Sequence, residues 1–391
     1  MYEDYQQKIT SIRERGLFRS LKKVEKRRGS KIRVDGKEYL NLSSNDYLGI
    51  AVDEEFHKEF YQPMGDENRI DCFGLGSSSS RLLSGNSFLY DQLEKELALW
   101  YKKESALVFN SGYHANLGIL PALTGKDDVV FSDKENHASL IDGLKLSEGE
   151  FFRFPHLDYD KLEEILKKKR NLYKKAVIVS ESVFSMDGDR ADLKRLAELK
   201  EKYDCMLYID EAHAAGVLGE TGQGQSEEDG VSGKIDILVG TFGKALAGVG
   251  AYAVMDEIVK DMLVNTMRPF IFTTALSPVQ LYWSLTVVKK IPFMKEQRNH
   301  LKKISKLLRT GLAERGFQTG GDSQIIPVFI GENEKAVKKS EALQKEGLLL
   351  FPIRPPTVPA GTARIRISLG AFLSEQEMEW ILSVFEKGGK E

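Results

Sequence analysis

Cysteine is scarce in this sequence: only Cys72 and Cys205 occur among 391 residues. Cys205 opens an apolar stretch that predicts a buried strand, so we expect no disulfide framework and a reducing, cytoplasmic location. The acidic N-terminus, Met1–Tyr5, lacks the hydrophobic segment of a signal peptide. No apolar run is long enough to span a bilayer, so no membrane contact is expected.

An excess of positive charge is also missing, since 56 lysines and arginines are balanced by 58 aspartates and glutamates. The chain therefore has no net positive charge that would favour binding to a nucleic acid or an anionic membrane. With 41% hydrophobic and 29% charged residues, the composition is that of an ordinary globular protein, large enough for two domains. No metal site is expected.

One stretch past the middle of the chain, Val239–Ala245, presents a lysine where a predicted strand ends. The stretch ends in Thr-x-Gly-Lys, and small residues follow Lys244. A second predicted strand ends at Asp210, three residues before His213. Pyridoxal phosphate enzymes need a lysine for the Schiff base and an aspartate that keeps the pyridine nitrogen protonated. A lone lysine after a strand is usually a solvated loop charge, but its pairing with Asp210 favours a pyridoxal phosphate site.

Apolar runs alternate with helical patterns from about residue 105, which is typical of a mostly parallel sheet covered by helices on both faces. Strands are expected near residues 106–109, 129–132, 151–154, 176–180, 206–210, 237–240 and 251–255. Ligands of such sheets bind at the carboxyl ends of the strands. Polar clusters follow four of these ends, at residues 110–113, 133–137, 181–187 and 210–213.

Three regions are expected along the chain. They are an N-terminal helical arm with a hairpin over residues 1–45, a large α/β cofactor domain over 46–285, and a smaller α+β domain over 286–391. The apolar residues of the first 28 positions fit one helical stripe. A long helix from about 277 to 315 should be interrupted near Pro292. The last helix should begin with a capping box at Ser374–Glu377.

Other side chains at predicted element ends could also carry chemistry. Gly112 and Tyr113 lie at a strand-to-helix junction, where backbone amides can hold a phosphate. His137 could lie over an aromatic ring, or it could belong only to a helix cap. Arg364 and Arg366 alternate on one strand, so they face the same side. They suit the capture of a carboxylate, or they could be protective charges on an edge strand.

Two rival functions lack the residues that they require. The segment Gly74–Arg81 resembles a dinucleotide fingerprint, but no strand precedes it and its third glycine is missing. Asp210–His213 spells the acidic box of a nucleic-acid helicase. Helicases also need a phosphate-binding loop of the form Gly-x-x-x-x-Gly-Lys-Ser/Thr. Two Gly-Lys pairs fail to complete that motif, because Lys244 is followed by alanine and Lys234 by isoleucine.

The sequence resembles the α-oxoamine synthases, fold-type I pyridoxal phosphate enzymes that join an amino acid to an acyl-CoA with loss of CO2. The resemblance runs nearly end to end. It rests on the segments Asn41–Gly49, Asn136–Ser139, Glu181–Gly188, Asp210–His213, Thr241–Lys244 and Gly361–Arg366. Two features depart from the family pattern: its Gly-rich loop is serine-rich here, at Ser77–Ser80, and Tyr90 stands where many members have histidine.

The resemblance implies a catalytic role for three residues. Lys244 would form the Schiff base and then act as the base, Asp210 would pair with the pyridinium, and His137 would stack on the ring. The remaining cofactor contacts would be made near the phenolate oxygen by Ser185 and His213, and at the phosphate by Gly112, Tyr113 and Thr241. Thr274 would reach the phosphate bound in the other subunit, which implies an obligate homodimer.

The resemblance also implies a substrate site. Asn45 and Arg366 would bind the carboxylate of the amino acid, and Arg19 matches a substrate-site arginine. The segment that opens with Arg354-Pro355-Pro356 favours L-alanine with a pimeloyl thioester of CoA or acyl carrier protein, because its prolines present a rigid wall to a long chain. Glycine with acetyl-CoA is the alternative pair. An inactive scaffold subunit would be expected to lack Lys244.

Overall fold

The computed structural model describes residues 2–387, and the chain divides into two compact units. The first unit comprises Met1–Val52, Ser185–Asp189 and Asn299–Glu391, and the second comprises Asp53–Phe184 and Arg190–Arg298. The expected arm, residues 1–45, therefore falls in one unit with the C-terminal residues. No helix within the described residues is both long and apolar enough to cross a membrane.

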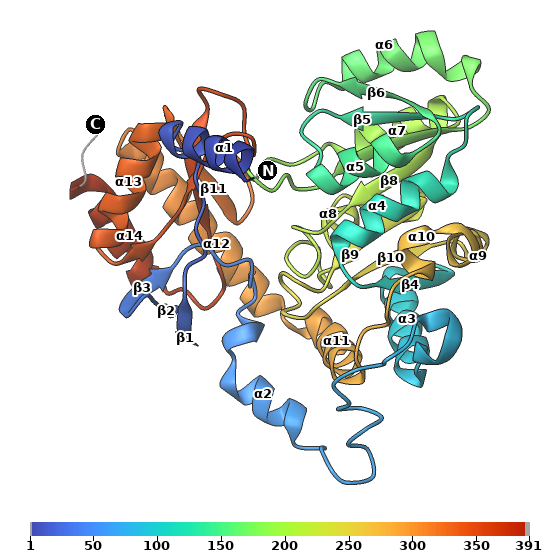
Figure 1. Cartoon of the computed structure of the whole chain (residues 1–391), viewed down its shortest axis with the longest axis horizontal. Helices are drawn as coiled ribbons and strands as arrows, with labels where there is room; N and C mark the ends of the chain where they lie inside the picture. The colour runs from blue at the N-terminus through green and yellow to red at the C-terminus, as the bar shows by residue number, and fades with distance from the viewer. Residues whose placement is uncertain (1, 388–391) are drawn as a thin grey trace. The chain divides into compact units, whose positions relative to one another are not determined.

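A seven-stranded sheet forms the centre of the second unit, in the order β4-β10-β9-β8-β7-β5-β6 (Figure 1). Its strands are β4 (Ser105–Phe109), β5 (Val129–Asp133), β6 (Glu150–Phe154), β7 (Ala176–Glu181), β8 (Met206–Asp210), β9 (Ile237–Thr241) and β10 (Ala251–Met255). All seven expected strands are present. Strand β10 is antiparallel to both neighbours and the other pairs are parallel, which confirms a mostly parallel sheet.

Helices pack on this sheet and cover its apolar strands. The helical segments are α2 (Glu54–Tyr61), η2 (Arg81–Gly85), α3 (Phe88–Tyr101), α4 (Gly112–Leu123), α5 (Ala138–Leu146), α6 (Tyr159–Lys169), η3 (Arg170–Leu172), α7 (Leu193–Lys202), α8 (Gln225–Glu228), η4 (Ser232–Lys234), α9 (Glu257–Thr266), α10 (Arg268–Ile271), α11 (Pro278–Lys290) and η5 (Ile291–Phe293). Strands β4, β5, β7 and β10 are buried at every position, as expected for a sheet covered on both faces.

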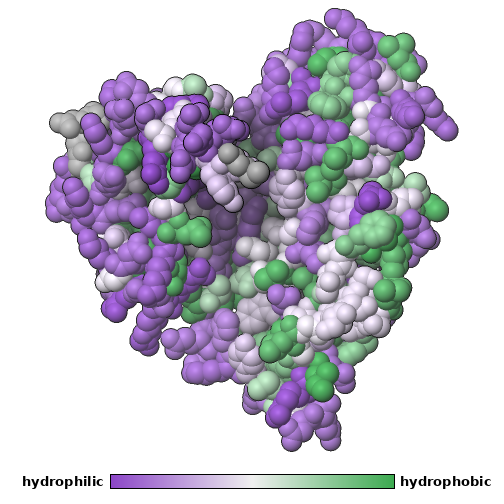
Figure 2. All heavy atoms as spheres, in the orientation of Figure 1, coloured by the Kyte–Doolittle hydropathy of each residue, from purple (hydrophilic) through white to green (hydrophobic). Residues whose placement is uncertain are grey.

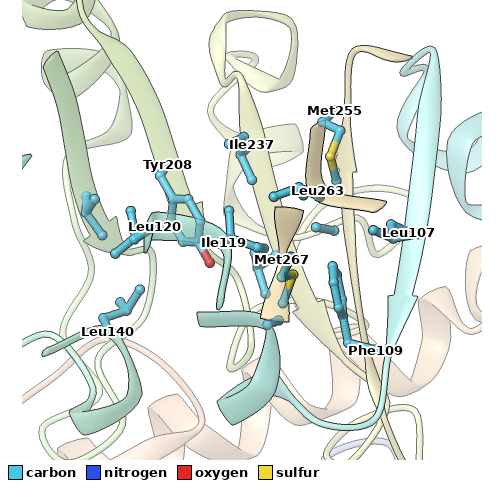
Figure 3. Close-up of a cluster of buried hydrophobic side chains, with 14 of the residues drawn as sticks. Leu107, Phe109, Ile119, Leu120, Leu140, Tyr208, Ile237, Met255, Leu263 and Met267 are labelled. Carbon is cyan, nitrogen blue, oxygen red and sulfur yellow. The ribbon is translucent and has the colours of Figure 1, made fainter. Parts of the chain in front are cut away.

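One core cluster of the second unit lies between the sheet and helices α4, α5 and α9 (Figure 3). Ile119 and Leu120 of α4 pack with Leu140 of α5, and Tyr208 and Ile237 contribute from the sheet. These side chains are at most 1% exposed. Because this contact removes the apolar face of α4 from water, it fixes the start of α4 next to the carboxyl ends of the strands.

The first unit contains two small sheets, β1-β2-β3-β12 and β11-β14-β13. Their strands are β1 (Val24–Arg28), β2 (Lys31–Val34), β3 (Lys37–Asn41), β11 (Ile325–Gly331), β12 (Leu348–Leu349), β13 (Pro352–Ile353) and β14 (Ala363–Ser368). Its helical segments are α1 (Glu3–Glu14), η1 (Ile50–Val52), α12 (Lys295–Glu314, which starts in the second unit), α13 (Asn333–Lys345) and α14 (Glu375–Lys387).

The single helix expected over the first 28 residues is wrong. Helix α1 ends at Glu14, and Gly16 takes a positive φ of 64°, which ends the helix. Residues 24–28 instead pair with β2 across a turn at Gly29, also at positive φ, so their backbone groups are satisfied by a strand partner. The local apolar spacing carried no information about that partner.

Two expected features of the last third are confirmed. The long helix is interrupted, since α11 and α12 are separated by the short turn Ile291–Phe293 that contains Pro292. The capping box also forms. The backbone N–H of Ser374 donates to Glu377 Oε2 at 2.7 Å, and Ser374 Oγ accepts from the Glu377 N–H at 3.2 Å.

Candidate active site

Several predicted site residues, together with Asn116, Ser139 and Tyr47, which were not predicted, form two groups, one in each unit. We call the second-unit group Lys244, His213, Asp210, Asn116, Ser139 and His137 the cofactor cluster. We call the first-unit group Arg366, Asn45, Tyr47 and Ser185 the arginine cluster. Each cluster is described within its own unit.

Lys244 lies just after β9 in the loop that returns to β10. The loop is closed by main-chain hydrogen bonds between Phe242 and Gly250, at 3.0 Å, and between Gly248 and Phe242, at 2.7 Å. Lys244 Nζ is 2.7 Å from Nε2 of His213, which follows β8 and is 5% exposed. The structure therefore brings together the lysine and the histidine that the sequence placed after neighbouring strands.

Asp210 ends β8, and both of its carboxylate oxygens are held by neutral donors. Oδ1 accepts from the Ala212 N–H at 2.8 Å, and Oδ2 accepts from Asn116 Nδ2 at 2.7 Å. Asp210 is 5% exposed and Asn116 is 2% exposed. Asn116 was not among the predicted site residues. The feature that could have indicated a role for it is an amide side chain within the mostly apolar segment that forms α4.

His137 caps α5, because its Nδ1 accepts from the Ser139 N–H at 3.2 Å. His137 therefore does cap α5, and its expected position over an aromatic ring stays a prediction. The residue is exposed as a whole, while its ring nitrogen Nδ1 lies in a part-buried position. Burial of the ring atoms lowers the pKa of His137, and the charge of Lys244 lowers it further, while Asp210 and Asp142 act against this shift.

Glu181, at the end of β7, holds the main chain of His137 by a hydrogen bond. Its carboxyl accepts the His137 backbone N–H at 2.5 Å and is buried, with 3% of the residue exposed. Burial and the charge of Asp210 raise the pKa of Glu181 well above its ordinary value, although Lys244 acts in the opposite direction. The protonated form of this acid is therefore favoured, which limits the number of negative charges around Asp210.

The residues predicted to hold a phosphate meet at the start of α4. Ser111 caps the helix, and the first-turn amides of Gly112 and Tyr113 have no partner within the helix. A side chain at Gly112 would lie 3.9 Å from Thr241, so the two residues are neighbours. The Thr241 hydroxyl donates to the Gly250 carbonyl at 3.0 Å. This arrangement suits an anion at a helix N-terminus.

Thr274 is exposed, and the main chain around it is held by side chains of its own unit. Asn110 Nδ2 donates to the Thr274 carbonyl at 2.7 Å. Ser77 Oγ donates to a carbonyl at 3.0 Å and Tyr90 OH accepts an amide at 2.8 Å, both in the main chain of residues 275–276. The two departures from the family pattern therefore lie against the Thr274 segment.

Arg366 of β14 forms the centre of the arginine cluster. Its Nε donates to the Ser185 carbonyl at 2.6 Å, and its Nη2 donates to Asn45 Oδ1 at 3.2 Å. Arg364 pairs with Asp187 in the same segment, so the two arginines face one side as predicted. Strand β14 is the central strand of its sheet. The alternative of protective charges on an edge strand is therefore wrong.

The N-terminal arm brings a second pair of arginines together. Arg19 Nη2 donates to the Pro355 carbonyl at 3.5 Å, and Arg354 donates to the Gly16 carbonyl. Burial and then the like charge of Arg19 lower the pKa of Arg354. Within residues 2–387 both arginines donate to main-chain carbonyls and no ion pair is described for either, so their charges are not neutralised by a described carboxylate.

The remaining expectations concern metals and thiols. Among residues 2–387 no group of histidine, cysteine, aspartate and glutamate side chains is arranged to hold a metal ion. Both cysteines are free thiols, and burial raises the pKa of Cys205 to about 11.

Comparison with known proteins gives matches over nearly the full chain. The family model for aminotransferase class I and II matches residues 37–385. An 8-amino-7-oxononanoate synthase from Chlorobaculum parvum is 48% identical over 375 residues, which cover 96% of each chain.

Solved structures share the fold. A serine palmitoyltransferase from S. paucimobilis, solved with PLP and myriocin bound, matches with a TM-score of 0.90 and 30% identity over 100% of this chain and 97% of that one. An 8-amino-7-oxononanoate synthase from Francisella tularensis matches with a TM-score of 0.75 and 28% identity over 89% and 97%. The chain therefore belongs to the aminotransferase class I and II family and has the fold-type I architecture of its pyridoxal phosphate-dependent transferases.

Proposed function

We propose that the protein is a pyridoxal phosphate-dependent acyltransferase of biotin biosynthesis. It condenses L-alanine with a pimeloyl thioester and releases CO2 and the thiol to give 8-amino-7-oxononanoate. The observation that carries this proposal is the 48% identity, over 96% of both chains, to a protein of that activity by name. The expected location is the cytoplasm, where free thiols such as Cys72 and Cys205 persist.

The residues of the cofactor cluster fit pyridoxal phosphate. An amine at Lys244, a fixed carboxylate at Asp210 and the imidazole of the exposed residue His137 match its aldehyde, its ring nitrogen and its flat face. The amides of Gly112 and Tyr113 suit its phosphate. When bound, this cofactor supplies an electron sink that stabilises a carbanion at the amino acid's α-carbon.

The chain's own residues transfer one proton, position the lysine nitrogen and stabilise the charge on the cofactor's ring nitrogen. Lys244, once released from the cofactor, takes the α-proton of alanine, and a positioned base of this kind contributes roughly 10²–10⁴-fold to the rate. His213 holds the lysine nitrogen at 2.7 Å. Asp210 keeps a positive charge on the ring nitrogen through a charge-assisted hydrogen bond. Ser185 is proposed to contact the phenolate oxygen.

The arginines supply the recognition of substrates. Arg366 and Asn45 bind the carboxylate of alanine, while Arg19 and Arg354 face the acyl donor. Each methylene contributes about 1–3 kcal/mol to discrimination in an apolar site. Selection of pimeloyl over acetyl groups should therefore exceed selection of alanine over glycine, which differ by one methyl group.

A homodimer with shared sites is the proposed assembly. Thr274 is exposed, the neighbouring Phe272 is 72% exposed, and a groove of about 670 Å³ runs between α4 and α10. Figure 2 shows hydrophobic side chains gathered over α10. Mixing Lys244→Ala with Thr274→Ala subunits should restore activity, because one site of each heterodimer keeps both residues. An active monomer in sedimentation would contradict the shared site.

The substrate assignment is tested by comparing kcat/KM for two substrate pairs. L-Alanine with pimeloyl-CoA or pimeloyl acyl carrier protein should be preferred to glycine with acetyl-CoA. Thiol release gives the rate, and mass spectrometry identifies the product. A higher kcat/KM for glycine with acetyl-CoA would instead assign the 2-amino-3-ketobutyrate ligase reaction and leave the cofactor residues unchanged.

A further inference from the structure

Asn116 is a buried amide whose polar atoms all contact members or neighbours of the cofactor cluster. Its Nδ2 donates to Asp210 Oδ2 at 2.7 Å and to Ser139 Oγ at 2.9 Å. Its Oδ1 accepts from the phenol of Tyr208 at 2.6 Å. Asn116, Ser139 and Tyr208 are each at most 2% exposed. In such a place water cannot replace a lost partner, so the network determines how these groups point.

The orientation of the amide follows from the donors and acceptors around it. An ionised carboxylate can only accept hydrogen bonds, so the NH₂ end must face Asp210. The Tyr208 phenol then donates to the oxygen end. A flipped amide would place its oxygen against Asp210 Oδ2, and two acceptors at that distance repel. Asp210 therefore selects the orientation of the amide, and the Tyr208 phenol, which can donate or accept, stabilises that orientation by donating to Oδ1.

The same amide determines the role of the Ser139 hydroxyl. Because Ser139 Oγ accepts from Asn116, its own proton is available for His137 Nδ1, which lies 2.8 Å away. The Ser139 backbone N–H also donates to this nitrogen, at 3.2 Å. Since both neighbours are donors, Nδ1 must be an acceptor. The single proton of a neutral His137 then lies on Nε2.

The charged groups around His137 agree with a neutral ring. Asp210 and Asp142 favour the protonated form, whereas burial and Lys244 oppose it, and burial is the largest effect. Glu181 contacts the His137 main chain and favours its own protonated, uncharged form. The net effect lowers the pKa of His137.

We infer that Asn116 is a positioning residue that orients Asp210 and, through Ser139, holds His137 as the Nε2–H tautomer. One amide would thus aim the carboxylate at the cofactor's ring nitrogen and present an N–H donor from His137 to the bound substrate. The role of Asp210 rests on the proposed function, whereas the tautomer is a property of the chain itself.

The tautomer is tested by nitrogen NMR of the holoenzyme labelled with ¹⁵N-histidine. The chain has six histidines, and His137→Gln identifies the signal of interest. The wild type should show Nε2–H, and Asn116→Ala should shift the population toward Nδ1–H and raise the pKa of His137. A wild-type Nδ1–H signal, or an unchanged signal in the variant, would overturn the inference.

The kinetic test uses a milder change in case Asn116→Ala fails to fold. Tyr208→Phe deletes only the hydroxyl that donates to the amide oxygen and so helps to hold the amide in place. Tyr252→Phe is its matched control, since Tyr252 is equally buried in the same sheet and bonds Tyr101 OH at 2.7 Å. Tyr208→Phe should lower kcat by about three- to tenfold and shift the His137 signal, with little change in KM. Tyr252→Phe should change neither.

Asn116→Ala should lower kcat by on the order of ten- to a hundredfold, because it removes a hydrogen bond to a charged group. Equal effects of Tyr208→Phe and Tyr252→Phe on kcat and on the His137 signal would show that the network is only structural. The NMR result does not depend on the acyl substrate. A wrong substrate assignment and a wrong role for Asn116 are therefore distinguishable.

Discussion

The cofactor cluster and the arginine cluster each hold a central charge with neutral described partners, whereas Arg364, beside the arginine cluster, is paired with a carboxylate. Asp210 is buried and has neutral donors on both oxygens, an amide and a backbone N–H. Arg366 has carbonyl, amide and phenol oxygens as its described partners, whereas Arg364, two residues earlier, pairs with the carboxylate of Asp187. A charged group with only neutral partners can still attract a ligand of opposite charge, whereas a group in an ion pair is largely neutralised by its partner.

This difference distinguishes two arginines on one strand. Arg364 is 4% exposed and bridges β14 to the segment that contains Asp187, so its role is structural. Arg366 is oriented by Ser185 and Asn45 but is not neutralised by them. The partners, rather than the residue type, therefore indicate which cation can bind an incoming carboxylate.

The largest expected effect is at Lys244. Lys244→Ala removes both the covalent link to the cofactor and the base, so kcat should fall by at least about 10⁴-fold. Borohydride reduction followed by peptide mapping should label Lys244 in the wild type. Lys234→Ala, which removes an exposed lysine in a similar Gly-Lys context, should keep full activity. Labelling of another lysine would refute the assignment of the cofactor cluster.

Asp210→Asn tests the charge of the cofactor cluster. The amide cannot hold the ring nitrogen protonated, so exchange of the alanine α-proton should slow by about 10²–10³-fold. Deuterium exchange followed by NMR measures this rate. Asp236→Asn is the control, because Asp236 accepts hydrogen bonds from Leu207 and Lys200 beside the same strand. Near-normal exchange in Asp210→Asn would contradict the proposed role.

Arg366→Lys tests the arginine cluster. Lysine keeps the charge but loses the planar pair of donors, so the KM for alanine should rise by about ten- to a hundredfold with a smaller change in kcat. Arg364→Lys should leave this KM unchanged and lower the unfolding midpoint instead. Steady-state kinetics and urea denaturation separate the two outcomes. An equal rise in KM for both variants would remove the distinction between the arginines.

The smallest effect concerns the stability of the first unit. Burial raises the pKa of Asp46 from 3.8 to about 6. Between these values the folded state holds a proton that the unfolded state has released, so stability should fall as pH rises through this window. The contribution is at most about 3 kcal/mol.

Asp46→Asn should remove this pH dependence in urea denaturation between about pH 4 and pH 6. Asp35→Asn, on an exposed turn, is the control. If both variants retain the wild-type slope, burial of Asp46 does not determine the effect.

The strands, the helix break and the helix start could be predicted from the sequence, because each depends mainly on residues close together in the chain. Apolar runs predicted the seven strands of the large sheet, and most of these runs are continuous because a strand covered on both faces excludes polar residues. Pro292 predicted the helix break, and the capping residues predicted the start of α14. Lys244 and Asp210 were predicted because each lies at or shortly after the carboxyl end of its strand, at the edge where ligands bind.

The pairing of polar side chains that are distant in the sequence depends on the tertiary structure and could not be predicted. Asn116 meets Asp210 across 94 residues, and Arg366 meets Asn45 across 321. The end of the N-terminal arm became a strand because β2 offered hydrogen bonds that no local pattern reveals. A buried polar group must find a partner wherever packing brings one, and packing is a property of the whole fold. The sequence thus predicted which residues could carry the chemistry, and the fold decided which neighbours hold them in place.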